Sequence, residues 1–148
     1  MKHVVFAIGV LASGILQAAQ PNFPQGSYAG TATWRGPGNA TGTYMVERSI
    51  IGSTISSRYA WTEPQPREEK SSVTFVMKDS GPLFDVLDEK KQVVGSGYCY
   101  DDTCAYRSTF GPVTVDETLT WSQGSFVATG AKTGPGFSVV WKETLKAR

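Results

Sequence analysis

Short segments of turn-forming residues divide this chain at close intervals, and they constrain its fold more than any other feature. They combine glycine, proline, asparagine, aspartate and serine, which tight turns favour. The segments fall at residues 36–39, 51–53, 79–82, 88–91, 111–112, 122–124 and 134–136. The stretches between them leave no room for the helix of a parallel crossover connection, so neighbouring strands are expected to pair antiparallel.

The stretches between the turns alternate in polarity and are rich in Thr, Ser, Val, Tyr and Trp, as β-strands are. Only residues 63–70, which are charged and contain prolines, are expected to form a longer, mobile loop. The strands are expected near 26–34, 41–50, 53–62, 71–78, 82–88, 92–100, 104–110, 112–122, 125–131 and 136–145. The predicted fold is all-β, an antiparallel meander of about eight to ten strands closed into a barrel, because closure removes exposed strand edges. A two-sheet sandwich is the alternative, but it needs long connections between the sheets that are hard to find here.

The first residues are typical of a signal peptide. Lys2 and His3 give a basic start, residues 4–16 are apolar or small, and Ala18 and Ala19 offer a small-residue exit. The sequence therefore predicts a signal peptide over 1–19, a single β-barrel domain over 20–148, and a secreted or periplasmic location. The apolar run is shorter than the roughly 20 residues that span a bilayer, so no transmembrane segment is expected after the signal is removed.

Charge and histidine content exclude several classes of function. The 14 Lys and Arg nearly balance the 13 Asp and Glu, which argues against a nucleic-acid partner. The single histidine, His3, lies in the expected signal peptide. Without it the mature chain cannot build a Ser-His-Asp or Cys-His catalytic site or most zinc sites. No cofactor and no metal site are predicted, since Asp101 and Asp102 are too few ligands for calcium.

Cys99 and Cys104 are the only two cysteines of the chain, and four residues separate them. In an exported protein an even pair of this kind indicates a disulfide, here one that clamps a hairpin turn. A redox-active pair would instead be expected as C-x-x-C near a helix start, which this sequence lacks.

Alternation along the expected strands assigns one face of each to the barrel interior. The apolar stripes are broken by Arg48, Glu117 and Glu143, which either hold the polar end of a ligand or pair with one another, or lie at a barrel mouth in water. Two inward carboxylates do not by themselves make an acid–base pair, so no catalytic residue is predicted. The candidate ligand-binding residues are Tyr44, Arg48, Tyr59, Trp61, Phe75, Glu117, Trp121, Trp141 and Glu143.

This arrangement resembles the calycin-type barrels, the group that holds lipocalins, fatty-acid-binding proteins and avidins. The first strand opens with Gly26-Ser27-Tyr28, where lipocalins carry Gly-x-Trp, and the late run 137–141 is similar to an avidin strand. The resemblance covers the mature chain as an architecture, and it implies a meander barrel with an interior ligand site.

Two classes of function are therefore expected to compete. The first is a binding protein that holds a small apolar or amphipathic molecule inside the barrel, with Arg48 meeting any acidic group. The second is a protein-interaction module, such as a periplasmic enzyme inhibitor, with a solid core and contacts through the loops 63–70 and 99–104. A histidine-free enzyme and an outer-membrane barrel remain further alternatives. An interior cavity of at least about 300 Å³ would favour the first, and a filled core the second.

Overall fold

The computed structural model describes residues 23–148 apart from 64 and 80. The expected signal peptide, residues 1–19, lies outside the described residues. The prediction of an all-β fold is confirmed. The elements are β1 (Gly26–Arg35), η1 (Pro37–Asn39), β2 (Thr41–Ile51), β3 (Thr54–Trp61), β4 (Arg67–Met77), β5 (Leu83–Leu87), β6 (Val93–Tyr100), β7 (Thr103–Phe110), β8 (Val113–Ser122), β9 (Ser125–Gly134) and β10 (Phe137–Ala147).

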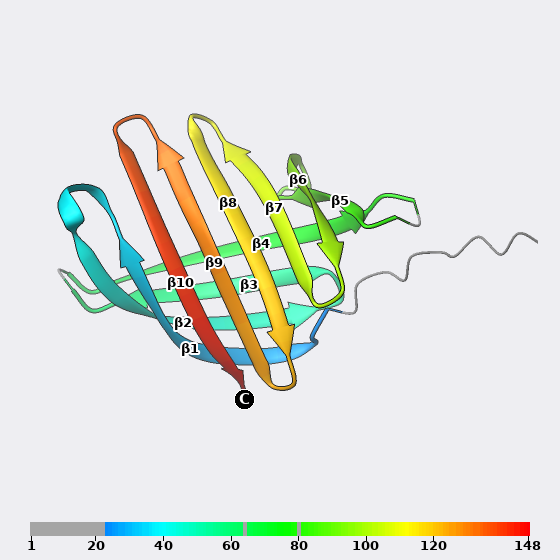
Figure 1. The fold of residues 1–148 in the computed structure, drawn as a ribbon, viewed down its shortest axis with the longest axis horizontal. Coiled ribbons are helices and arrows are strands. Elements are labelled where there is room, and N and C mark those ends of the chain that lie inside the picture. Colours follow the sequence, from blue (N-terminus) through cyan, green and yellow to red (C-terminus); the bar gives the residue numbers. More distant parts are fainter. Residues whose placement is uncertain (1–22, 64, 80) are drawn as a thin grey trace, which may run out of the picture.

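The ten strands form one closed antiparallel barrel. Each strand pairs with its neighbours in sequence, and β1 pairs with β10 to close the ring, with Trp34 opposite Trp141. Figure 1 shows β2–β4 crossing behind β7–β10 at a steep angle, with β1 curving between the two layers. The sandwich alternative is thereby excluded.

Two glycines allow the strands to bend where these layers meet. A Cβ atom at Gly30 in β1 would lie 2.0 Å from the carbonyl oxygen of Thr144, and one at Gly95 in β6 would lie 2.0 Å from that of Arg107. No other residue could bring its strand so close to a neighbouring backbone. Glycine kinks of this kind give a β-sheet the curvature that closure requires.

The interior side chains follow the predicted alternation. Val46, Ile50, Leu119 and Leu145 are buried on their strands, as their positions on the expected inward faces require. Arg48 and Glu143 are buried among them, with only 3% and 1% of their surface exposed. The charged residues on the inward stripes of β2 and β10 therefore lie inside the barrel and not at its mouth in water.

Aromatic packing closes one end of the barrel. Phe23, just before β1, is buried with its ring centroid 5.5 Å from those of both Phe75 and Trp121. The predicted disulfide joins Cys99 and Cys104, which face each other across the β6–β7 hairpin at the same end. This closed end holds the continuous apolar core of the molecule.

The opposite end, the mouth, has a gap in its wall beside β4. Strand β4 begins at Arg67 but pairs with β5 only from Thr74 to Met77, so residues 67–73 have a partner strand, β3, on one side alone. Strand β7 likewise runs two residues beyond its pairing with β6, which stops at Ser108. The β5–β6 hairpin is thus too short to reach the mouth.

The same region corrects the expected mobile loop. Only residues 62–66 connect β3 to β4. Arg67–Lys70 belong to β4, where the side chain of Glu68 forms an ion pair with that of Arg58 on β3. The cluster of charges suggested a solvated loop, but charged side chains also protect an exposed strand edge from pairing with another chain. The β3 backbone supplies the pairing that places them in a strand.

Candidate functional site

A cavity of about 350 Å³ occupies the mouth half of the barrel interior. It is bounded by side chains from seven strands, β2, β3, β4, β7, β8, β9 and β10. Ile55, Val73 and Leu119 give it apolar walls toward the core, while Glu69 and Lys132 lie exposed at its rim. The cavity therefore runs from solvent at the mouth to a polar floor in the middle of the barrel.

The floor of the cavity is built on a buried ion pair. The Nη2 atom of Arg48 lies 2.8 Å from Oε2 of Glu143, as an ion pair and not as an aligned hydrogen bond. The Nε atom of Arg48 donates to Oγ of Ser57 at 2.9 Å, and the Tyr44 hydroxyl donates to Oε1 of Glu143 at 3.2 Å. The guanidinium also lies over the ring of Phe126, 5.1 Å from its centroid. Among the described residues, Nη1 of Arg48 has no hydrogen-bond partner.

A second carboxylate lies on the same floor. Glu117 on β8 accepts a hydrogen bond from the hydroxyl of Tyr106 on β7, through its Oε2 atom. Oε1 of Glu117 accepts no hydrogen bond from the part of the chain that the structure describes. The floor thus holds two carboxylates, Glu143 and Glu117, and one guanidinium, that of Arg48.

Burial, with a smaller contribution from the second carboxylate, shifts the pKa of Glu143 on the floor. Burial raises the pKa of Glu143 from 4.5 to about 7, because the attraction of Arg48 does not offset the loss of water and Glu117 adds repulsion. Burial alone would lower the pKa of Arg48, but the two carboxylates raise it, so the guanidinium stays charged. Glu143 is therefore the group that gains or loses a proton near neutral pH.

The tyrosines around the floor remain hydrogen-bond donors. Burial is the main cause that raises the pKa of Tyr44, Tyr59 and Tyr106 above the ordinary value, and the nearby carboxylates raise it further. Their hydroxyls consequently keep their protons throughout the physiological range of pH.

Three aromatic rings form one wall between the floor and the mouth. The centroid of Tyr44 lies 4.9 Å from that of Trp61 and 6.0 Å from that of Tyr59. At the mouth, the guanidinium of Arg67 lies 4.4 Å from the centroid of Trp61. The wall offers flat apolar surface and π faces that attract cations.

Most of the predicted site residues meet around this cavity. Those that line it are Tyr44, Arg48, Tyr59, Trp61, Glu117, Trp141 and Glu143. Phe75 and Trp121 also face the interior, but they do not line the cavity and pack against Phe23 at the closed end. Alternation gives the face of a side chain but not its height in the barrel, and the plug residue Phe23 fills the space they would have lined.

Sequence reasoning missed several lining residues, of which Tyr106 matters most. Its signal was present, because an inward Cys104 in a hairpin disulfide places Tyr106 and Ser108 on the same inward face. Lys132 follows Phe126 and Ala128 at even spacing on β9 and could have been found in the same way.

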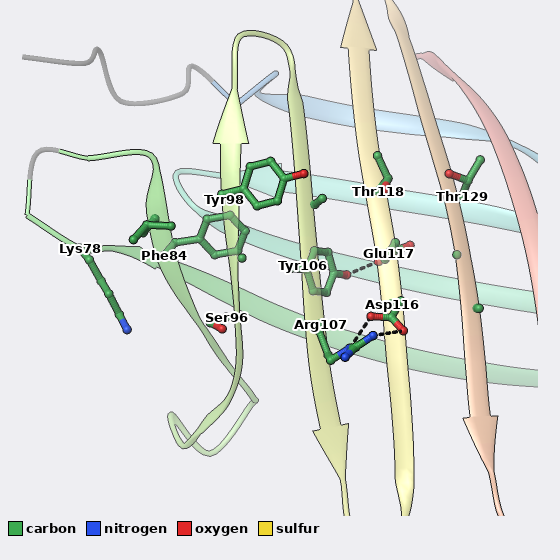
Figure 2. Close-up of a pocket in the computed structure, with 15 residues that line it drawn as sticks. Lys78, Phe84, Ser96, Tyr98, Tyr106, Arg107, Asp116, Glu117, Thr118 and Thr129 are labelled. Carbon is green, nitrogen blue, oxygen red and sulfur yellow. Dashed lines mark hydrogen bonds and ion pairs between the residues drawn. The ribbon is translucent and has the colours of Figure 1, made fainter.

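A larger depression, of about 730 Å³, lies over the outer side of β6–β9 (Figure 2). Most of its charged side chains are paired at the surface, since Arg107 binds both oxygens of Asp116 at 2.6 and 3.1 Å and Lys78 lies 2.7 Å from Asp85, while Glu117 borders the depression as well as the interior cavity. These side chains are partly or largely exposed to solvent, which screens them. The interior cavity is smaller, but it combines buried charge, an unpaired donor and apolar walls, and it is therefore the better candidate site.

The described residues hold no cluster of three or more His, Cys, Asp or Glu that could bind a metal ion. Within the same residues, no helix has the length and apolar character needed to cross a membrane.

Comparison with known proteins places the fold alone. No protein-family model matches the sequence, and no curated protein matches it. Among solved structures, the chain is similar to an S-type phycobiliprotein lyase from Guillardia theta, with a TM-score of 0.69 and 8% sequence identity. The match covers 84% of this chain and 88% of that one. At this identity the likeness extends to the barrel architecture and not to the residues of the cavity.

Proposed function

We propose that this protein is a secreted or periplasmic binding protein that holds a small amphipathic molecule inside its barrel. The observation that carries the proposal is the cavity of about 350 Å³, which runs from the mouth to a floor of buried charged groups. Ligand sites typically measure about 300–1,000 Å³ and combine apolar walls with a few polar anchors. The cavity lies at the small end of this range, so the ligand is a small one.

The unpaired guanidinium nitrogen at the floor supports a site that takes a ligand. A buried donor without a partner costs roughly 1–3 kcal/mol, and structures seldom carry such a cost without a role. Arg48 is also held by Ser57 and Glu143, so its orientation is fixed before a ligand arrives. The resemblance to calycin barrels and the fold shared with the lyase agree with an interior site.

The rival function, a protein-interaction module, has less support. That interpretation needs a solid core, whereas the mouth half of this barrel is open. It also needs the β3–β4 connection and the β6–β7 turn to form one contact surface. Because successive hairpins of a meander alternate between the two ends, these segments lie at opposite ends of the barrel (Figure 1).

Export is the part of the proposal that depends on the sequence alone. A signal peptide over 1–19 would leave a mature domain of 20–148, and intact-mass measurement of protein from the native compartment should give a mature start at Ala19 or Gln20. Soluble protein that retains Met1 would contradict it.

Binding is tested with N-phenyl-1-naphthylamine, a neutral apolar probe whose fluorescence increases out of water. We expect a saturable response with one site per chain. Val115→Trp, which fills the cavity from β8, should abolish the response, while Thr114→Trp, on the opposite face of the same strand, should leave it intact. Circular dichroism and thermal unfolding confirm that both variants fold. A wild-type protein that gives no saturable response would refute the proposal.

A further inference from the structure

The inference concerns the polar end of the ligand, and it rests on the proposed function. Sequence reasoning made Arg48 the anchor of an acidic group. In the structure, however, part of the anchoring capacity of Arg48 is already used inside the protein. Its Nη2 atom lies against Glu143 and its Nε atom donates to Ser57, so the bidentate edge formed by Nε and Nη2 is not available to clamp the carboxylate of a ligand. Nη1, which has no hydrogen-bond partner among the described residues, remains for a ligand.

The charge of the floor also disfavours an acid. The floor holds two carboxylates, Glu143 and Glu117, beside Arg48, and an anionic ligand would add a third negative charge to this partly buried site. Burial is the main cause that raises the pKa of Glu143, and the repulsion of Glu117 raises it further against the attraction of Arg48, so a further anion on the floor would be opposed by both effects. Lys70 and Lys132 do not correct this imbalance, because they lie exposed at the rim, where water screens them.

Of the two carboxylates on the floor, Glu117 is the more accessible to a donor; Oε2 of Glu143 also accepts no hydrogen bond from the described residues, but it is buried against Nη2 of Arg48. Glu117 is only partly buried, it lines the cavity, and one of its oxygens is held by Tyr106. That hydrogen bond fixes the carboxylate, and Oε1 takes no donor from the described residues. The aromatic wall of Tyr44, Tyr59 and Trp61 lies on the path from the mouth, and such rings attract cations.

From these contacts we infer that the cavity selects amphipathic amines, whose ammonium group donates to Glu117 while their apolar part lies along the aromatic wall. The positive charge of the ligand balances the second carboxylate. The negative charge of the two carboxylates repels fatty acids and other anions. Nη1 of Arg48 then remains for a neutral acceptor, such as a hydroxyl group or water.

The test uses three ligands with one apolar scaffold, namely 4-phenylbutylamine, 4-phenylbutanol and 4-phenylbutyrate. Their affinities are measured by isothermal titration calorimetry at pH 8 and pH 6. At pH 8 we expect the amine to bind about 10- to 150-fold more tightly than the alcohol, the gain from one charge-assisted hydrogen bond, and the carboxylate to bind most weakly. Equal or tighter binding of the carboxylate would overturn the inference.

The pH dependence adds an independent readout. The titratable and charged groups around Glu143 and Glu117 are Tyr44 and Arg48 on β2, Tyr59 on β3 and Tyr106 on β7. The tyrosines and the guanidinium keep their protons between pH 6 and pH 8, and the charges of the amine and the carboxylate are constant there. Protonation of Glu143 at pH 6 removes negative charge from the floor, so the preference for the amine over the carboxylate should narrow. A preference that widens at pH 6 would contradict the inference.

Matched variants locate the contact. Glu117→Gln keeps an acceptor for Tyr106 but removes the charge, and it should cancel the advantage of the amine while leaving binding of the alcohol unchanged. Glu63→Gln, at an exposed glutamate that does not line the cavity, is the control, and it should retain the advantage. An advantage that survives Glu117→Gln would place the ammonium elsewhere and refute the assignment.

The outcomes separate the two proposals. If the alcohol binds and the amine gains nothing, the inference fails and the binding function stands. If none of the three ligands binds and the naphthylamine probe is also inert, both fail.

Discussion

Replacing Glu143 by Gln should make the barrel more stable at neutral pH, although it breaks a buried ion pair. The glutamine side chain resembles the protonated carboxyl group in shape and charge, and its oxygen can still accept from Tyr44. Burial raises the pKa of Glu143 from 4.5 to about 7. Each unit of difference between the folded and unfolded values is worth about 1.4 kcal/mol, so the shift corresponds to about 3 kcal/mol.

The sign follows from proton binding. Between pH 4.5 and about 7, the native protein binds more protons at Glu143 than the unfolded chain does. The free energy of unfolding therefore falls as pH rises through this window, and the contribution is complete below it and lost above it. Hydrogen bonds from Arg148 and Arg58 lower the pKa values of Glu47 and Glu68, so the stability that these two carboxylates contribute is lost only as pH falls below their ordinary pKa. The pH dependence from Glu143 and that from Glu47 and Glu68 therefore fall in different ranges of pH.

The assay is urea unfolding of the wild type and of Glu143→Gln at pH 5 and pH 8, followed by tryptophan fluorescence. We expect similar stabilities at pH 5 and an advantage of up to about 3 kcal/mol for the variant at pH 8. Glu69→Gln, at the rim, should follow the wild type at both values. A Glu143→Gln protein that is about 3–5 kcal/mol less stable at pH 8, the usual cost of orphaning a buried charge, would refute the reasoning.

Three further predictions concern the closed end and the corners of the barrel. Phe23→Ala should lower the free energy of unfolding by about 3–5 kcal/mol in urea titrations, because it removes the ring that packs between Phe75 and Trp121. A loss below about 1 kcal/mol would mean that the Phe23 ring does not fill the closed end. Replacing both cysteines of the disulfide by Ser should cost about 2 kcal/mol without preventing folding, since the closed loop is short, and a thiol assay of the unfolded, unreduced wild type should find no free cysteine. Gly30→Val should prevent soluble expression, because its Cβ would meet a backbone oxygen at 2.0 Å, whereas Gly81→Ala, whose nearest atom lies at 3.8 Å, should be tolerated.

The strand pattern of this protein could be predicted from its sequence because local rules decide it. Turn residues set the hairpins, and alternation placed Arg48 and Glu143 on inward faces, where the structure finds them. These two residues share no local signal that they pair, since they lie far apart in the sequence and meet only because the barrel closes through β1 and β10. The sequence favoured a closed barrel, but an ion pair between the inward charges was only one of the alternatives that it left open.

Height in the barrel was the feature that sequence reasoning could not supply. Alternation places both Phe75 and Trp61 on inward faces, yet one belongs to the core and the other to the cavity. The difference depends on Phe23 filling one end and on the β5–β6 hairpin stopping short of the other. Phe23 lies far along the chain from both residues, and the hairpin acts through its length, which the alternation of β3 and β4 does not reveal.

An even number of up-and-down strands also returns the backbone to the end where it began. Phe23 packs in the closed end, and the backbone N–H of Arg148 donates to the carbonyl oxygen of Ser27 beside it. A short linker from residue 148 to residue 23 would therefore cross only the closed end, and a new opening at the β8–β9 turn would lie there as well. Such a circular permutant should form the same barrel with an unchanged mouth, because a closed ring of hydrogen-bonded strands can begin at any strand.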